Sequence, residues 1–336
     1  MKNLFIKKKN TILLLFFIIC FILAFFFHKS TKKIKIQKKK ESQQTNNKKN
    51  IILKGDPPSE LIILPPSPTS RNNLTYCPNY TPKDKEFSQV PLKYMHGISI
   101  IITAYKMAQF IKETLDSIAR QTWFKKHKNY EILIGVDGCN ETLKYLQGIM
   151  KNYKNLRVFM MESNKGTFIT TNTIMSLAKY DSILRFDADD IMMPDLIKIL
   201  MEKSESEDVD RIMFKCQNFG KKSDKIGWAS GQIFMKHWVF DYFGGFMPWR
   251  CEGDGEFSNR VDKFLTVIRI PIILMKRRIH DSNLTTAKKT GLHSVFRKWH
   301  ENYRLNISLN IKNINDAVII KIIDDFQEIF PNTIIK

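Results

Sequence analysis

The strongest constraint on the fold is a regular alternation of apolar strands and amphipathic helices between residues 97 and 203. A first strand is expected at GISIIIT, and the apolar residues of the next segment then recur at helical spacing. The same order of strand and helix occurs three more times. The expected strands are 97–103, 131–137, 156–161 and 182–187, and the expected helices are 108–121, 141–152, 167–178 and 194–203. This alternation is typical of an α/β fold in which helices cover a mostly parallel sheet.

The second half of the chain alternates less regularly. The expected strands there are 210–216, 232–235 and 267–275, and the expected helices are 236–243 and 253–263, with mostly helix from residue 293 onward. We therefore divide the folded part into a first half at 97–200, a second half at 201–290 and a C-terminal helical segment at 291–336.

The N-terminal region has the pattern of a membrane anchor. Residues 12–27 form an unbroken run of 16 apolar residues. As a helix this run would be about 24 Å long, near the roughly 30 Å of a bilayer core. A cleaved signal peptide is the alternative, but the run ends in phenylalanines and His28 without a small-residue cleavage site. We expect a basic tail at 1–10 and an uncleaved single-pass transmembrane helix at 11–27. Lysines flank it on both sides, so the side of the membrane that holds the folded domain stays open.

The formal net charge of +21 is concentrated in the same region. Residues 1–54 contain 14 lysines and one acid, Glu41, and so account for +13 of that charge. A nucleic-acid binder would carry its basic residues on the folded domain, so we expect no nucleic-acid partner. Residues 28–96 are rich first in Lys, Gln, Asn and Ser and then in Pro. This composition predicts a disordered stem.

Polar residues and glycines stand at the carboxyl ends of all four strands in the first half. Thr103 and Tyr105 follow the first strand, Asp137 closes the second, and Asn164 comes after the third. The fourth strand ends in Asp-Ala-Asp-Asp. Open α/β sheets bind ligands beyond the carboxyl ends of their strands, so this edge predicts a nucleotide-binding crevice.

The sharpest signal is the carboxylate cluster of Asp187, Asp189 and Asp190. Three crowded carboxylates repel one another and raise each other's pKa values. A hard divalent cation, Mn²⁺ or Mg²⁺, relieves that repulsion and also binds diphosphate oxygens. The alternative is a solvated acidic turn that caps the following helix.

These segments carry a family resemblance. The first half resembles the nucleotide-binding half of family 2 glycosyltransferases, which have the GT-A fold. The matching pieces are IIITAYKMAQFIKETLDSIARQT, EILIGVDGCNET, ESNKGTFITTNTIMSLA and SILRFDADDIMMPD. The pieces GGFMPWRCEGDGEF and RRIHDSN extend the resemblance into the second half. The resemblance implies that residues 97–200 bind a nucleotide-sugar and that residues 201–290 bind the acceptor.

The resemblance also implies roles for single residues. It assigns nucleotide-sugar binding to Thr103, Tyr105, Asp137, Arg185 and Asp187, metal binding to Asp189, Asp190 and His280, and general-base catalysis to Asp254. The chain departs from the family pattern at Val136, Cys139 and Gly253, where members often have aspartate, serine and glutamate. Glu256 is the alternative base.

The expected activity is metal-dependent, inverting transfer of a hexosyl or N-acetylhexosaminyl group. The expected donor is a UDP-sugar, and the acceptor is a hydroxyl of a glycan, protein or lipid. The alternative of another class is a non-catalytic, membrane-anchored protein that binds carbohydrate or nucleotide with a degenerate transferase fold. A nucleotidyltransferase would need a Gly-rich phosphate loop after the first strand, and TAYKMAQ is not one.

Overall fold

The computed structural model describes residues 94–221, 224–319 and 326–329. All of them belong to one compact unit of the chain. The expected basic tail, the expected anchor and nearly all of the expected stem lie outside the described residues. Within the described ranges, no helix combines the length and the apolar character that crossing a bilayer requires.

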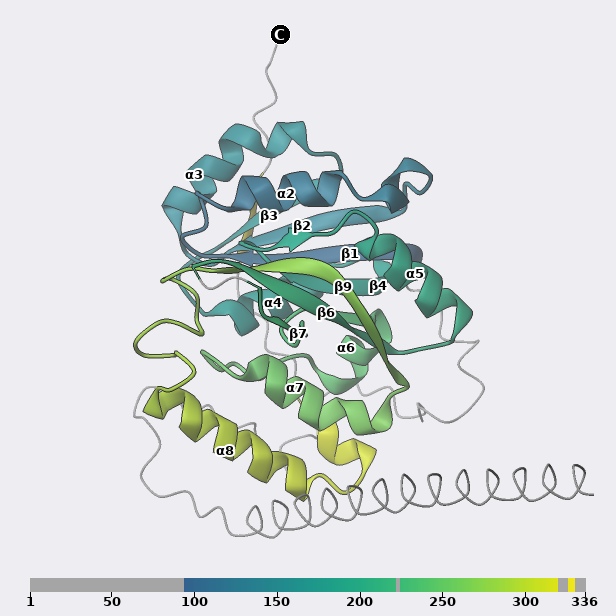
Figure 1. Cartoon of the computed structure of the whole chain (residues 1–336), viewed down its shortest axis with the longest axis vertical. Helices are drawn as coiled ribbons and strands as arrows, with labels where there is room; N and C mark the ends of the chain where they lie inside the picture. Colours follow the sequence, from purple (N-terminus) through teal and green to yellow (C-terminus); the bar gives the residue numbers. More distant parts are fainter. Residues whose placement is uncertain (1–93, 222–223, 320–325, 330–336) are drawn as a thin grey trace, which may run out of the picture. The chain divides into compact units, whose positions relative to one another are not determined.

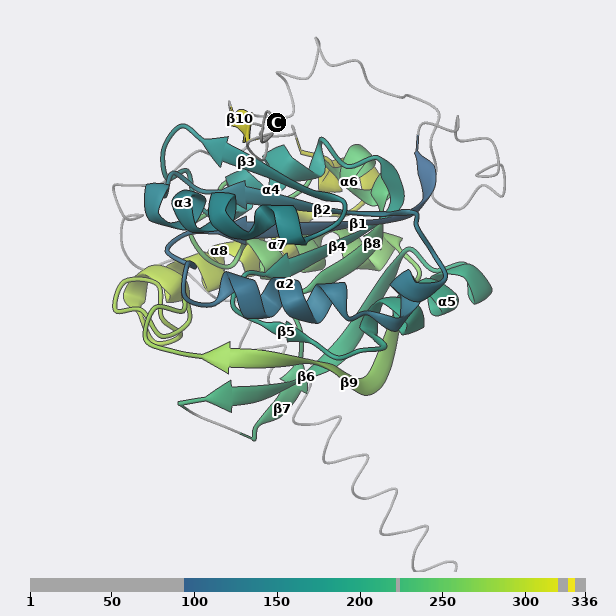
Figure 2. The ribbon, with the colours of Figure 1, turned by 90° about the horizontal axis from the view of Figure 1, so that it is seen from above.

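A ten-stranded sheet with the order β10-β3-β2-β1-β4-β8-β6-β9-β5 runs through the unit, and β7 pairs with β6 at its side (Figures 1 and 2). The strands are β1 (Met95–Ala104), β2 (Tyr130–Val136), β3 (Leu156–Met161), β4 (Tyr180–Asp187), β5 (Ile191–Met192), β6 (Arg211–Gly220), β7 (Ile226–Trp228), β8 (Ile233–Lys236), β9 (Val267–Ile279) and β10 (Phe326–Ile329).

Helices cover both faces of this sheet. They are α2 (Ile111–Ala119), α3 (Asn140–Ile149), α4 (Thr167–Met175), α5 (Leu196–Ser206), α6 (His237–Phe243), α7 (Gly253–Val261) and α8 (Val295–Asn310), with short 3-10 helices at Thr122–Lys125, Met150–Asn152, Asp262–Phe264 and Ile314–Ala317. Apolar residues of α2, α3 and α5 pack in one hydrophobic cluster, and those of α4, α6 and α7 pack in a second. In Figure 1, α2 and α3 lie on one side of the sheet and α4, α6 and α7 on the other.

The central strand β1 is a continuous apolar run because both of its faces are buried. Ile98, Ile100 and Ile102 belong to the first cluster, while Ile101 points to the second. Successive side chains of a strand face opposite sides, so a strand covered on both faces must be apolar at nearly every position. Both clusters consist of described residues, and the unit therefore buries its own core without residues 1–93.

The expectation of a parallel sheet is confirmed for the first half. β1 pairs in parallel with β2 and β4, and β2 pairs in parallel with β3. The rest of the sheet is mixed, because β8 is antiparallel to both β4 and β6 while β9 is parallel to β6. The term mostly parallel therefore describes only the first half, since the sequence pattern gave no information on how the later strands join it.

The C-terminal segment also differs from the expectation of a helical end. Residues 295–310 form α8 as expected, but Phe326–Ile329 forms β10, antiparallel to β3. The Arg157 guanidinium on β3 donates to both carboxylate oxygens of Glu328, at 2.7 and 3.0 Å. Strand β10 is thus held by the open edge of β3, a tertiary cause that the local sequence does not reveal.

Candidate functional site

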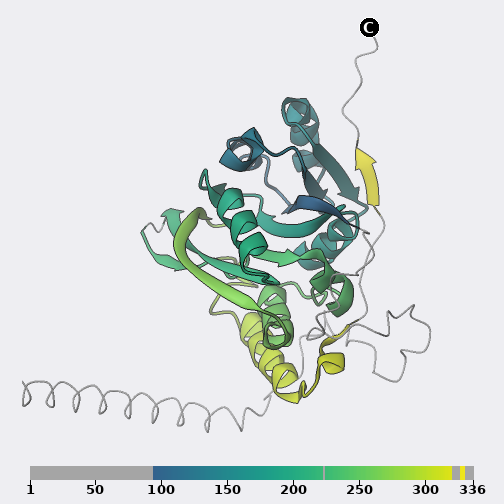
Figure 3. The ribbon, with the colours of Figure 1, turned by 90° about the vertical axis from the view of Figure 1, so that its right-hand side faces the viewer.

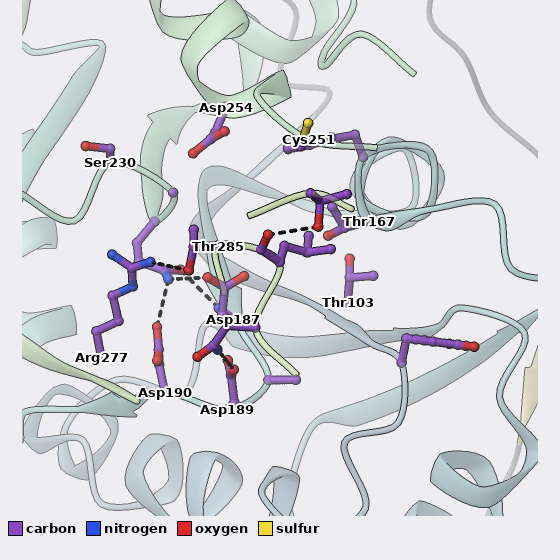
Figure 4. Close-up of a pocket in the computed structure, with 18 of the residues that line it drawn as sticks. Thr103, Thr167, Asp187, Asp189, Asp190, Ser230, Cys251, Asp254, Arg277 and Thr285 are labelled. Carbon is purple, nitrogen blue, oxygen red and sulfur yellow. Dashed lines mark hydrogen bonds between the residues drawn. The ribbon is translucent and has the colours of Figure 1, made fainter. Parts of the chain in front are cut away.

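A cavity of about 840 Å³ lies at the carboxyl ends of β1, β2 and β4. The loop after β3, the loop between β7 and β8, the start of α7 and the segment between β9 and α8 also line it. Figure 4 shows part of this cavity, with Asp254 on α7 pointing toward the acid cluster at the end of β4. The position agrees with the crevice that the strand ends predicted.

The acid cluster is compact. One oxygen from each of Asp187, Asp189 and Asp190 lies within 4.8 Å of the other two. Thr114 on α2 supports the turn from below, with its hydroxyl 2.9 Å from the Ala188 carbonyl oxygen and 2.8 Å from that of Asp190. Asp189 and Asp190 are buried, whereas Asp187 is partly exposed. The turn is therefore a fixed group of converging carboxylates, not a solvated acidic loop.

Two neighbours orient Asp187 and Asp190. Arg185 Nη2 lies 2.6 Å from Asp187 Oδ1. The Gln232 side-chain amide donates to Asp187 Oδ2 at 2.6 Å and lies 3.0 Å from Asp190 Oδ2. Gln232 Oε1 in turn accepts from the Asp187 backbone N–H at 3.0 Å. Gln232 therefore fixes two of the three carboxylates relative to each other.

Asp189 is held by the segment that follows β9. Its Oδ2 lies 2.8 Å from His280 Nε2 and accepts from Asn283 Nδ2 at 2.9 Å. Ser282 N–H donates to His280 Nδ1, so Nε2 carries the proton and donates to Asp189. His280 therefore orients Asp189 in this conformation, and it would have to give up that bond to ligate a metal itself. Among the described residues, none donates a hydrogen bond to Asp189 Oδ1.

The electrostatics of the cluster favour a cation. Burial raises the pKa of Asp187, even though Arg185 opposes the shift. Burial also raises the pKa of Asp190 well above its ordinary value, and the charges of Asp189 and Asp187 raise it further. Keeping the carboxylates of Asp187 and Asp190 ionised is therefore costly without a compensating charge. An oxygen-rich group with one carboxylate oxygen still open fits a hard divalent cation.

Three acids stand at the start of α7, and they differ in their partners. Glu252 is paired with Arg297. Glu256 is buried and accepts a hydrogen bond from Arg260, whose Nε lies 2.6 Å from Glu256 Oε1. The carboxylate of Asp254 is half-buried, lines the cavity and accepts no hydrogen bond from any residue in the described part of the chain. Of the two candidate bases, Asp254 is thus the one with a free carboxylate facing the cavity.

A glycine separates Asp254 from the acid cluster. A Cβ added at Gly231 would lie 3.3 Å from Arg185 Nη1, 3.4 Å from Asp254 Oδ2 and 3.9 Å from Asp187 Oδ2. The absence of a side chain at Gly231 therefore leaves open the space on which these three groups converge.

The far end of the cavity contains the residues expected at the nucleotide. Asp137 is buried, and its Oδ1 accepts from Lys165 N–H at 2.7 Å and from the Thr170 hydroxyl at 3.0 Å. Its Oδ2 accepts from Gly166 N–H at 3.0 Å. Burial raises the pKa of Asp137, and these donors oppose the shift. Asp137 therefore fixes the loop after β3, and one lone pair of Oδ2 remains for a ligand N–H.

Thr103 and Tyr105 lie beside Asp137. The Thr103 hydroxyl is 2.9 Å from the Thr171 hydroxyl on α4, so it is held at the cavity wall. Tyr105 leaves 39% of its surface exposed, and its ring lines the same wall. An exposed aromatic ring at a cavity edge can stack on a planar base.

Helix α7 is tied to the C-terminal part of the chain. Glu252, the N-cap of α7, has a left-handed backbone (φ 65°). Its carboxylate pairs with Arg297 on α8 and lies 3.6 Å from Arg304 Nε. Arg297 also donates to the carbonyl oxygens of Thr290, at 2.6 Å, and Leu284, at 3.4 Å. Helices α7 and α8 pack side by side (Figures 1 and 3).

The structure brings the predicted site residues into one place. The residues Thr103, Tyr105, Asp137, Arg185, Asp187, Asp189, Asp190 and Asp254 all line the cavity, and His280 contacts it through Asp189. Sequence reasoning missed Gln232, Glu252 and Arg297. Gln232 carries no motif, and its role depends on the antiparallel pairing of β8 with β4. Asn283 stands in the motif RRIHDSN, three residues after His280. That short spacing was the one sequence feature that could have indicated a role for Asn283 beside His280.

Comparison with known proteins gives a consistent result. The family model described as Glycosyl transferase family 2 matches residues 99–282. An uncharacterized glycosyltransferase of Haemophilus influenzae is 31% identical over 112 residues, 33% of each chain. A chondroitin synthase of Escherichia coli is 28% identical over 127 residues, 38% of this chain and 18% of that protein. The matched segments thus span a third or less of these relatives' own length.

Among solved structures, residues 1–349 of S. aureus TarS in complex with UDP-GlcNAc superpose with a TM-score of 0.55 at 15% identity, covering 66% of this chain and 69% of that one. Similarity at this identity concerns the fold, and it agrees with the GT-A-like arrangement of sheet and helices. Because the family model covers more than half of the sequence, this chain belongs to glycosyl transferase family 2.

Proposed function

We propose that the protein transfers a hexosyl or N-acetylhexosaminyl group from a UDP-sugar to an acceptor hydroxyl, with inversion at the anomeric carbon and with a divalent metal. The observation that carries this proposal is the convergence of two groups in one cavity. The acid cluster lies at the end of β4, and the free carboxylate of Asp254 faces it across Gly231. The acid cluster can thus act on the leaving group while Asp254 acts on the acceptor hydroxyl in the same cavity.

The donor is proposed to lie along the strand ends. The free lone pair of Asp137 would accept the imide N–H of uracil, beside the Tyr105 ring and Thr103. Arg185 and Asp187 would bind the part of the donor nearest the sugar, held as a pair by their 2.6 Å contact. The S. aureus TarS structure that shares this fold is a complex with UDP-GlcNAc, which supports a UDP-sugar as the first donor to test.

The chemical step follows from Asp254. Its carboxylate takes the proton of the acceptor hydroxyl while the hydroxyl oxygen bonds to the anomeric carbon. Attack comes from the face opposite the nucleoside diphosphate, which departs with the electrons of the broken glycosidic bond. One displacement inverts the anomeric carbon.

Asp189 and Asp190 are the residues proposed to hold Mn²⁺ or Mg²⁺, with His280 beside them, and the bound cation would supply positive charge for the departing diphosphate. The open Oδ1 of Asp189 and the raised pKa of Asp190 support this assignment.

We also propose that the enzyme is held at a membrane by a single-pass helix at residues 11–27. The apolar run and its flanking lysines support this proposal at the level of sequence. The acceptor can then be a glycan, a protein or a lipid.

The direct test is a donor screen with the purified protein. Each nucleotide-sugar is incubated with and without Mn²⁺, and released nucleoside diphosphate is measured. Turnover of one UDP-sugar that requires the metal supports the proposal. Tight donor binding without turnover, with any acceptor or with water, would instead indicate a non-catalytic binding protein.

A further inference from the structure

The mouth of the cavity carries exposed apolar side chains. Leu284 and Leu292 both line the cavity and are 45% and 54% exposed. The Leu292 backbone N–H donates to the Thr285 carbonyl oxygen at 3.0 Å, which brings the backbone at Leu292 next to the residue that follows Leu284. Val295, the first residue of α8, is 86% exposed. Exposed apolar side chains that gather at the rim of a cavity are typical of an interaction surface.

The same stretch is strongly basic. Residues 284–298 contain Lys288, Lys289, Arg297 and Lys298 but no Asp or Glu. Arg297 is buried against Glu252, while the three lysines are exposed. On α8, residues three apart lie on one side, so Lys298 stands beside Val295. We define the mouth surface as Leu284, Leu292, Val295, Lys288 and Lys298.

Aliphatic residues interleaved with lysines are complementary to the interface of an anionic bilayer. The aliphatic side chains enter the boundary between headgroups and acyl chains, and the lysines meet the acidic headgroups. A protein partner with an acidic, apolar surface would present similar groups, but the leucines here open directly into the cavity. A bilayer explains that location, because it would present an acceptor hydroxyl at the mouth.

We propose that the mouth surface docks on an anionic lipid surface and turns the cavity toward acceptors carried at that surface. The docking is separate from the expected anchor at residues 11–27, since it involves only described residues. It is reversible and weakened by salt, because a few side chains without a spanning helix give marginal membrane affinity. Vesicle binding itself does not depend on the proposed transferase activity, whereas its role in bringing the cavity to acceptors rests on that proposed function.

The test uses a chain that starts at residue 90, because the described residues bury their own core. Flotation with vesicles of phosphatidylcholine, with or without phosphatidylglycerol, measures the partition coefficient. Binding is expected only with phosphatidylglycerol. The pair Lys288→Gln with Lys298→Gln should weaken it about 25-fold, or about fivefold per lysine. The pair Leu292→Ser with Val295→Ser should weaken it roughly tenfold or more.

Matched control variants distinguish binding through the mouth surface from nonspecific adsorption to vesicles. Met95 and Ile272 are 53% and 49% exposed but lie on β1 and β9, so Met95→Ser with Ile272→Ser should leave binding unchanged. Lys125→Gln with Lys126→Gln is the control for charge, since both lysines are exposed elsewhere. The proposal is overturned if the parental chain does not float with anionic vesicles, or if the control pairs lose as much binding as the mouth pairs.

Discussion

Replacement of Asp254 by Asn is the most informative change to make in this site. The substitution keeps the shape of the side chain but removes the basic oxygen that takes the acceptor proton. The Asp254 carboxylate accepts no hydrogen bond from the residues that the structure describes, so Asp254→Asn breaks no hydrogen bond among them. Its effect on the free energy of unfolding should lie within about 0.5 kcal/mol, as for surface substitutions.

The effect on catalysis should be much larger. Loss of a general base typically lowers the rate by about 10²- to 10⁴-fold. Transfer by Asp254→Asn should therefore fall by roughly that factor, while donor affinity changes little, because the acid cluster and Asp137 are untouched. The assay combines steady-state transfer kinetics with calorimetric titration of the donor.

Glu256→Gln is the matched control, two residues away on the same helix. Its carboxylate is buried with Arg260, whose guanidinium also donates to the carbonyl oxygens of Phe243 and Ala317 at 2.9 Å. Removing one charge of a buried pair costs about 3 kcal/mol. For a domain of this size that lowers the melting temperature by roughly 6–12 °C. The folded fraction of Glu256→Gln should still transfer sugar at the parental rate per molecule.

The two variants should thus have opposite phenotypes. Asp254→Asn loses catalysis and keeps its stability, whereas Glu256→Gln loses stability and keeps its catalysis. If Asp254→Asn transfers at the parental rate, or if Glu256→Gln loses turnover without losing stability, the assignment of the base is wrong.

Four further outcomes are expected. Asp189→Asn should abolish the rise in melting temperature that Mn²⁺ gives the parental protein, and chelation should abolish donor turnover; full activity in chelator would refute the metal site. Gly231→Ala should slow transfer roughly tenfold, because the new Cβ would press on Arg185 Nη1 at 3.3 Å and fill the space next to Asp254, and parental kinetics would contradict this reading. Deleting residues 1–30 should leave transfer kinetics unchanged, since both hydrophobic clusters lie after residue 94. Burial lowers the pKa of His300, so the unfolded chain binds the proton more readily and stability falls as the pH drops below the ordinary value of 6.5; His300→Phe should flatten this dependence in thermal melts across that range.

The elements that the sequence predicted well are those whose pattern is local. The strand expected at 156–161 is β3 (Leu156–Met161), and the helix expected from residue 167 begins at Thr167 as α4. Their apolar periodicity is set by burial within a few residues. The acid cluster was found for the same reason, because its three members stand within four residues of sequence.

The features that were missed depend on distant contacts. Gln232 reaches Asp187 across 45 positions because β8 pairs with β4. Arg297 reaches Glu252 across the same number of positions because α8 packs on α7. Strand β10 forms at the free edge of β3. No local periodicity encodes these pairings, so a single sequence could not predict them.

The segment from His280 to Arg297 has a consequence for how donor binding and acceptor binding affect each other. One end holds Asp189 through His280 and Asn283. The other end holds Glu252, the N-cap of α7, through Arg297. A donor and metal that stiffen the first end also reduce the entropy that an acceptor must lose at the second. Linkage then requires the converse, so an acceptor should tighten donor binding by the same factor. Calorimetric titration of each substrate in the presence of the other measures the two factors, which must agree, and absence of coupling would show that the two ends act independently.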